Sequence, residues 1–140
     1  VLKHHAEFEA LLAEYRDRMR QNRVQLTRML MFFSTNAFIY EPTFLWEDEQ
    51  TIYHRRVYPA ALLPKVPEHP ANPAGRALVK ELKGRIQELC SRNGASHMQV
   101  GKDYPYLASR KPETRALVED LKRLLDPDRL LNPGALGLPL

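Results

Sequence analysis

Few residues in this chain combine the type and the spacing that catalysis or metal binding requires. The only cysteine, Cys90, lies on the apolar side of a predicted helix, where a small buried hydrophobe is its expected role. A catalytic thiolate would need a basic neighbour and access to solvent, and Arg92, although close in sequence, is not evidently on the same face. The sequence lacks the Cys and His spacing of a zinc site, a Gly-rich phosphate loop and a G-x-S-x-G elbow. No metal site is therefore predicted.

A carboxylate in an apolar stretch is a second candidate. Glu41 interrupts the aromatic and β-branched run 37–46, which also contains Tyr40 and Trp46. If Glu41 is buried, it needs a partner or a raised pKa, whereas exposure at a sheet edge would make it ordinary. Tyr40 and Trp46 could line an aromatic substrate pocket, with core packing as the alternative.

The N-terminal elements that would position these residues follow from periodicity. Residues 1–41 contain neither Gly nor Pro, and apolar residues recur at helical spacing. This predicts one helix over about 4–32, or two helices meeting near Asn22, ended by the polar residues 34–36. The run 37–46 is then a strand, which Pro42 restricts to a sheet edge or a bulge.

The remaining elements are marked by proline and glycine. Five prolines between Pro59 and Pro73 predict an extended surface excursion, neither helix nor central strand. A helix follows, with Asn72 as N-cap, apolar positions 78, 82, 86 and 89 as its buried face, and Gly94 after its end. Residues 95–100 are expected to form a short strand with His97 and Gln99 on one face, and 101–110 a loop.

A second helix begins at Pro112, carries a leucine-rich side and ends at Asp126. The tail 135–140 is almost wholly apolar, so we expect it to bury against another surface. Helices with a few short strands, and no alternating strand–helix order, predict an α+β fold with a small antiparallel sheet flanked by helices.

Composition excludes several functional classes. The 140 residues are 44% hydrophobic and 27% charged, with a net charge of +4. The basic residues are mixed with acidic ones, which disfavours nucleic-acid binding. No run has the roughly 18 apolar residues of a membrane span, and the first residues lack the apolar region of a secretory signal. With one cysteine no internal disulfide forms, and a cytoplasmic location is expected. The start at Val1 rather than Met suggests a fragment.

Three stretches together resemble the C-terminal third of FAD-linked oxidases, the superfamily of vanillyl-alcohol oxidase and p-cresol methylhydroxylase. The ending 121–134, a helix closing in Lys-x-x-x-Asp-Pro and then a turn into Asn132-Pro133-Gly134, is similar to the family's closing pattern. The stretch 94–106 precedes that last helix as the family requires. The stretch 39–48 is like a strand of bacterial members of the vanillyl-oxidase branch.

The resemblance implies an FAD-dependent oxidoreductase that oxidises a small alcohol or phenol by hydride transfer to flavin. Residues 1–100 would belong to the substrate-covering cap, and 101–140 to a helical tail that returns to an FAD-binding domain absent here. The implied partners are the small-molecule substrate and that N-terminal flavin half, with a homodimer possible. The isolated chain is expected neither to bind FAD nor to turn over substrate.

The resemblance also implies roles for individual residues. In the vanillyl-oxidase branch a Gly-x-Tyr-Arg stretch holds the substrate phenolate, but here Gly101-Lys102-Asp103-Tyr104 is followed by Pro105. Tyr104 or Tyr106 could donate to a substrate oxygen, with Lys102 as a nearby cation. Further expected roles are His97 as a base, Gln99, Glu41 and Trp46 as substrate contacts, and Asn132 and Gly134 as flavin contacts.

Two alternatives remain open at this point. The hydroxy-acid branch, of D-lactate and glycolate dehydrogenase type, has Glu-His-Gly-Ile-Gly where this chain has residues 96–100, so only His97 is kept. The branch's metal-binding histidine motif is also absent. A non-catalytic module, in which the N-terminal helix and the proline-rich segment dock on a protein, is the second alternative.

Overall fold

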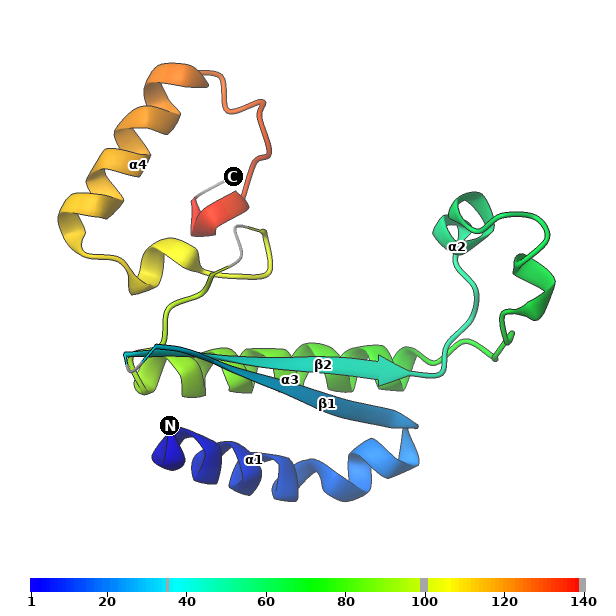
Figure 1. The fold of residues 1–140 in the computed structure, drawn as a ribbon. Coiled ribbons are helices and arrows are strands. Elements are labelled where there is room, and N and C mark those ends of the chain that lie inside the picture. The colour runs from blue at the N-terminus through cyan, green and yellow to red at the C-terminus, as the bar shows by residue number, and fades with distance from the viewer. Residues whose placement is uncertain (35, 99–100, 139–140) are drawn as a thin grey trace. The chain divides into compact units, whose positions relative to one another are not determined.

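The computed structural model describes residues 1–34, 36–98 and 101–138 (Figure 1). In chain order its elements are α1 (Leu2–Gln21), β1 (Val24–Phe33), β2 (Ala37–Trp46), α2 (Ile52–Val57), the 3-10 turn η1 (Leu63–Lys65), α3 (Pro73–Arg92), η2 (Tyr106–Ser109), α4 (Pro112–Leu125) and η3 (Ala135–Gly137). The predicted α+β class, with a small antiparallel sheet flanked by helices, is confirmed. The chain divides into two compact units, Val1–Arg85 and Ile86–Leu140. The predicted cap and tail boundary at residue 100 concerns a larger protein and stays a prediction.

The first unit corrects the longest predicted helix, which is wrong beyond Gln21 because Val24–Phe33 is a strand. At the end of α1, the Asn22 side-chain amide donates to the Arg18 carbonyl oxygen at 2.8 Å. Arg23 then takes a left-handed backbone, with φ of 54°. The strand pairs with β2 along its whole length, and this pairing overrides the helical spacing of its apolar residues.

The ribbon of β1 and β2 has a regular antiparallel register, with Arg28 opposite Pro42 and no bulge. Both strands are edges among the described residues, so the edge position predicted for Pro42 is confirmed. Because Pro42 has no N–H to donate, its pair with Arg28 must be a non-hydrogen-bonded one. The polar residues 34–36 were predicted to end a helix. Instead Ser34, with φ of 55°, and Asn36 flank the hairpin connection, while Thr35 lies outside the described residues.

Helix α1 packs against the ribbon through aromatic rings. The ring centroids of Phe8 and Tyr40 lie 4.8 Å apart, and those of His4 and Tyr40 lie 5.1 Å apart. Phe38 also contacts His4, so the even-numbered face of β2 faces α1. Burial lowers the pKa of His4, which suits a neutral ring in this cluster.

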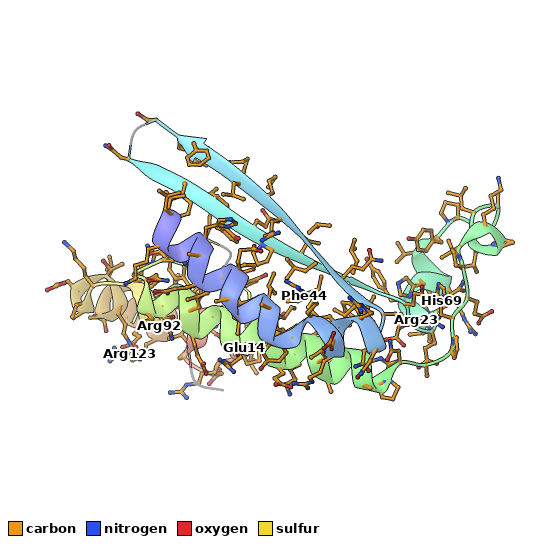
Figure 2. All side chains as sticks on the ribbon, turned by 90° about the horizontal axis from the view of Figure 1, so that it is seen from below. Glu14, Arg23, Phe44, His69, Arg92 and Arg123 are labelled. Atoms are coloured by element: carbon orange, nitrogen blue, oxygen red, sulfur yellow. The ribbon has the colours of Figure 1, made fainter. Side chains whose placement is uncertain are left out.

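Helices α1 and α3 lie side by side, as Figure 2 shows. The Tyr15 hydroxyl donates to Glu81 Oε1 at 2.8 Å, and Arg18 donates to both Glu81 oxygens at 3.0 and 2.7 Å. The core of this unit is formed by buried apolar side chains, which include Phe8, Leu11, Val24, Leu78, Val79 and Leu82.

Helix α3 is the element that the sequence predicted best. Asn72 Oδ1 accepts from the Gly75 N–H at 2.8 Å, which makes Asn72 the N-cap, and Pro73 opens the helix. The four predicted apolar positions are all buried: Leu78, Leu82, Ile86 and Leu89. Gly94 follows the helix with φ of 71°, a left-handed conformation that glycine adopts without strain.

The segment between β2 and α3 is only partly the extended excursion that was expected. Prolines keep most of residues 59–72 irregular, but Leu63–Lys65 forms a 3-10 turn. The short helix α2 before it was not predicted. Thr51 caps α2 reciprocally: its backbone N–H donates to His54 Nδ1 at 3.0 Å, and its side chain accepts from the helix backbone.

In the second unit the strand predicted over 95–100 is wrong for residues 95–98, which form no strand. Residues 99 and 100 lie outside the described residues. Among the described residues the sheet contains only β1 and β2, which pair with each other. The predicted loop 101–110 contains the 3-10 turn η2, whereas α4 and its end at Asp126 are confirmed. None of the helices formed by the described residues has both the length and the apolarity that crossing a bilayer needs.

Candidate functional site

Four aromatic and basic side chains gather in the second unit around the loop before α4. The guanidinium carbon of Arg110 lies 4.1 Å from the ring centroid of Tyr106. Arg110 Nη2 donates to the His97 carbonyl oxygen at 3.0 Å, and the ring of Tyr104 lies 5.9 Å from that of His97. Three of the predicted site residues, His97, Tyr104 and Tyr106, are therefore brought together, with Arg110 between them.

Two buried polar atoms of this cluster have no hydrogen-bond partner, His97 Nε2 and Arg110 Nε. They are the buried side-chain atoms that the described residues leave unsatisfied. Such atoms are costly to bury, so the cluster departs from the fully hydrogen-bonded state that is usual in a protein interior. Burial, with the Arg110 cation beside it, lowers the pKa of His97, which keeps the ring neutral near pH 7. A neutral imidazole beside a fixed cation can accept a proton while an anion is held nearby.

Local structure explains why these side chains converge. Within 104–110 the chain tightens into η2, where the Tyr106 N–H donates to the Tyr104 carbonyl oxygen at 2.8 Å. The turn ends where the Arg110 N–H donates to Leu107 at 3.1 Å, and Leu107 is buried beneath it. Gln87 of α3 also donates its side-chain amide to the Asp103 carbonyl oxygen, which ties the loop to the helix.

The C-terminal tail packs against the same loop. The Leu136 N–H donates to the Gly101 carbonyl oxygen at 3.3 Å. A Cβ atom added to Gly137 would lie 3.5 Å from the Pro105 Cα, and φ of Gly137 is 79°. The tail therefore approaches the loop of Tyr104 closely, and glycine suits both the approach and the backbone conformation.

The predicted flavin contacts Asn132 and Gly134 line a groove of about 630 Å³ between α4 and the tail. Both have left-handed backbones, with φ of 47° and 77°. Four cations line the groove with two carboxylates: Arg115, Lys122, Arg123 and Arg129 with Glu119 and Asp126. Its volume lies in the range of about 300–1,000 Å³ typical of ligand pockets. Three of these cations are ion-paired, Arg115 with Glu119, Lys122 with Asp126 and Arg123 with Asp120, so much of the positive charge of the lining is neutralised.

Asp126 shapes this groove by closing the chain after α4. Its carboxylate accepts from the N–H groups of Leu130 and Leu131 at 2.8 and 3.0 Å, and Lys122 pairs with it. These donors lower the pKa of Asp126, with Lys122 contributing most. The side chain is buried, so the turn that leads to Asn132 is fixed by one carboxylate.

The remaining predicted substrate contacts are Lys102, Gln99, Glu41 and Trp46. Lys102 is exposed in the same loop, and Gln99 lies outside the described residues. Glu41 is half-buried opposite Met29, on the odd-numbered face of β2 that does not carry the α1 contacts of Phe38 and Tyr40. Glu41 belongs to the first unit and His97 to the second, and the substrate contact of Glu41 stays a prediction.

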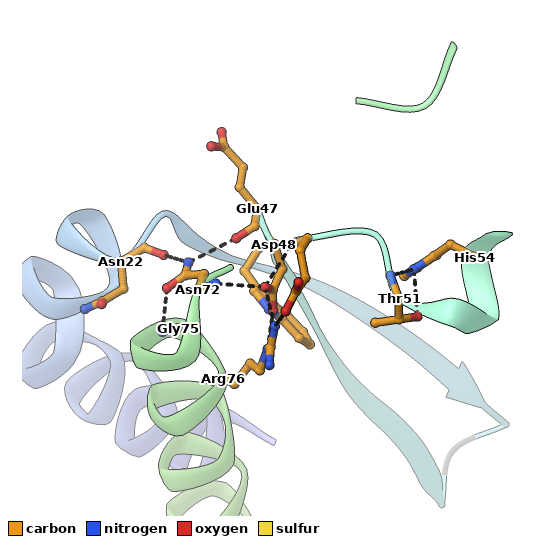
Figure 3. Close-up of polar contacts among 10 residues, drawn as sticks. Asn22, Glu47, Asp48, Thr51, His54, Asn72, Gly75 and Arg76 are labelled. Atoms are coloured by element: carbon orange, nitrogen blue, oxygen red, sulfur yellow. Dashed lines mark hydrogen bonds and ion pairs between the residues drawn. The ribbon is translucent and has the colours of Figure 1, made fainter. Parts of the chain in front are cut away.

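Trp46 contacts Asp48, and Figure 3 shows the contacts of Asp48 with Asn72 and Arg76. Trp46 Nε1 donates to Asp48 Oδ2 at 3.0 Å, and Arg76 donates to both oxygens of Asp48 at 2.7 and 2.8 Å. The Arg76 guanidinium holds the pKa of Asp48 well below its usual range. This carboxylate joins the end of β2 to the start of α3. Trp46 itself is 39% exposed, and its substrate contact stays a prediction.

Arg110 is the site residue that the sequence did not reveal. The resemblance draws attention to an arginine directly after the tyrosine, and Pro105 stands there. Arg110 reaches Tyr106 because η2 shortens the path between them, and no periodicity in the sequence signals a 3-10 turn of this length. The one signal in the sequence was the spacing of four residues between Tyr106 and Arg110.

Cys90 is half-buried on α3, and burial raises the pKa of its thiol, which disfavours a nucleophilic role. Among residues 1–34, 36–98 and 101–138, no cluster of His, Cys, Asp and Glu side chains could hold a metal ion. Comparison of the chain with family models, curated proteins and solved structures finds no match.

Proposed function

We propose that this chain is the C-terminal part of an FAD-dependent oxidoreductase that oxidises a small alcohol or phenol. The observation that carries the proposal is the convergence of His97, Tyr104, Tyr106 and Arg110, two of whose buried polar atoms lack partners. The ending through Asn132-Pro133-Gly134, which resembles that of FAD-linked oxidases, supports the same assignment.

The cluster has the groups that an alcohol or phenol oxidation needs at the substrate oxygen. When bound, FAD supplies the acceptor for a hydride from the substrate carbon. Arg110 and the Tyr106 hydroxyl favour a negative charge on the substrate oxygen. In this proposal the neutral ring of His97 takes up the hydroxyl proton when the substrate is an alcohol. Because Arg110 stacks on Tyr106 and donates to the His97 backbone, its cation is held in place before substrate arrives.

In this proposal the groove beside α4 receives one edge of the cofactor. Its lining combines cations with the left-handed turn of Asn132 and Gly134. The sequence has no Gly-rich phosphate loop, so the main grip on the cofactor belongs to another part of the protein. Asn132 and Gly134 are the residues of this chain that would contact FAD.

An unpartnered leucine stripe on α4 supports docking on a flavin-binding half. Leu117, Leu121, Leu124 and Leu125 recur at helical spacing and are all exposed, Leu124 by 75% and Leu125 by 73%. Leu130 and Leu131 extend the same exposed apolar surface toward Asn132. A stripe of this kind normally packs against another surface.

The direct test is the visible absorption spectrum of the full-length protein under anaerobic conditions, before and after addition of phenols, alcohols and 2-hydroxy acids. We expect a flavin spectrum that is bleached by an alcohol or phenol. Bleaching only by 2-hydroxy acids would move the protein to the hydroxy-acid branch, and absence of flavin would refute the assignment.

A matched pair of variants tests the role of Arg110. Loss of a charged hydrogen bond to an anion costs about 1.5–3 kcal/mol, so Arg110→Gln should raise KM or Kd for the substrate by roughly 10- to 150-fold. Arg110→Lys should recover part of this loss, while Arg16→Gln, an exposed arginine of α1, should have no effect. Equal affinities for Arg110→Gln and the unmodified protein would remove Arg110 from the site.

A further inference from the structure

The loop Thr51–Lys65, between β2 and α3, exposes an unusual set of apolar side chains. Neither α2 nor η1 within it contains a buried residue. Ile52 is exposed by 68%, Tyr53 by 67% and Val57 by 57%, and Tyr58 and Leu62 are exposed as well. In Figure 1 the loop leaves the end of β2 and returns to the start of α3.

The two ends of this loop are joined by a hydrogen bond, so the exposed side chains belong to an ordered segment. Gln50 donates its side-chain amide to the Val66 carbonyl oxygen at 3.1 Å, which closes the loop at its ends. Just below it, Arg76 pairs with both Asp48 and Glu49. A compact loop whose ends are joined resembles an Ω-loop, a type that often carries function.

Charge is distributed unevenly between this loop and its base. Residues 50–67 contain none of the 17 acidic residues of the chain, but they contain Arg55, Arg56 and Lys65. Arg55 reaches back to Glu68 at 3.4 Å, whereas Arg56 and Lys65 have no carboxylate partner among the described residues. The acidic residues 47–49 stand at the base, where they pair with Arg23 and Arg76. The loop therefore presents positive charge interleaved with exposed apolar and tyrosine side chains.

We propose that the loop Thr51–Lys65 is a membrane-docking site that binds surfaces rich in anionic lipid. Charge complementarity selects this occupant, because the loop is cationic and carries no acidic group that a negative surface would repel. Exposed Ile52 and Val57 supply apolar area for the interface, and tyrosines are favoured at the headgroup level. Arginine and lysine reach phosphates while their alkyl stems lie along the apolar layer.

The test is cosedimentation of the full chain with two vesicle types, phosphatidylcholine alone and an equimolar mixture with phosphatidylserine. We expect binding to the anionic vesicles only, weakened by added salt. Each basic residue near an anionic surface contributes a factor of about five, so the double variant Arg56→Gln/Lys65→Gln should bind roughly 30-fold more weakly. The double variant Arg16→Gln/Arg20→Gln removes the same charge from exposed positions on α1 and should bind as the unmodified chain does.

An apolar variant separates insertion from a purely ionic contact. Ile52→Ser/Val57→Ser should also weaken vesicle binding, and because both side chains are exposed its thermal unfolding should match that of the unmodified chain. The proposal is overturned if the chain stays in the supernatant with anionic vesicles, or if the α1 double variant loses as much binding as the loop variant. It is also overturned if soluble poly-glutamate binds in the same way while vesicles do not, which would assign the loop to an acidic protein.

Discussion

The side-chain amide of Asn72 joins three segments of the first unit, and the loss of stability on its removal can be calculated. Asn72 Oδ1 accepts from Gly75 N–H at 2.8 Å and caps α3. Its Nδ2 donates to the Asn22 carbonyl oxygen at 2.9 Å and to the Glu47 carbonyl oxygen at 3.0 Å. The end of α1, the end of β2 and the start of α3 therefore meet at this residue (Figure 3).

The substitution Asn72→Ala removes all three hydrogen bonds. Loss of an N-cap costs about 1 kcal/mol. Each of the two part-buried carbonyl groups loses a donor, which costs about 0.5–1 kcal/mol once partial hydration is allowed for. We expect the free energy of unfolding to fall by about 2–3 kcal/mol, the sum of these losses.

Gly75 provides a second substitution that tests the same geometry. A Cβ atom at Gly75 would lie 2.6 Å from Asn72 Nδ2, so Gly75→Ala should destabilise the chain by displacing the capping amide. In the Asn72→Ala background that obstacle is gone, and alanine should stabilise the helix by about 0.5–1 kcal/mol through its higher propensity. The sign of the Gly75→Ala effect should therefore reverse between the two backgrounds.

Urea unfolding followed by the fluorescence of Trp46, the only tryptophan, gives these free energies at constant m value. Asn72→Asp is the informative control, since it keeps the cap acceptor but removes both donors. If Gly75→Ala has the same effect in both backgrounds, or if Asn72→Ala costs less than the cap alone, the three-way role of Asn72 is wrong.

Two further predictions concern titration and docking. Arg18 and Tyr15 lower the pKa of Glu81 to about 2. The stability that the folded chain gains from these contacts should therefore be complete above the unfolded Glu pKa of about 4.3, and it should be lost as pH falls toward 2. Stability measured against pH should be flatter over this window in Glu81→Gln, and an unchanged slope would contradict the pairing. The double substitution Leu124→Glu/Leu125→Glu should leave the helix content of α4 intact by circular dichroism, because both leucines are exposed, but abolish coprecipitation with the flavin-binding half. Retained coprecipitation would show that α4 docks elsewhere.

The fold was predictable where local signals act alone. Asn72, Pro73 and Gly94 mark α3 because capping and left-handed geometry are short-range requirements. The strand β1 was not predictable, because its apolar residues satisfy a helical period and only pairing with β2 decides between the two structures. The polar break at Asn22 was visible, but it did not distinguish a second helix from a strand after it.

The candidate site was predictable in part for the same reason. His97, Tyr104 and Tyr106 are neighbours along the chain, so their proximity follows from a short loop. Arg110 joins them only because η2 folds the chain back, which depends on the buried side chain of Leu107 beneath the turn. Trp46 donates to Asp48, a contact that the sequence did not indicate, and its role as a substrate contact stays a prediction.

The position of Pro42 determines which edge of the β1–β2 ribbon can pair with a further strand. Since Pro42 faces Arg28 in a non-hydrogen-bonded pair, the outward row of β2 lacks a donor at its centre. The outward row of β1 contains no proline, and Arg28, its only charged residue, turns its side chain to Glu9 of α1. An additional strand, from another copy of the chain or from a neighbouring domain, can therefore pair along the whole of β1. Along β2 its hydrogen bonds would be interrupted at Pro42.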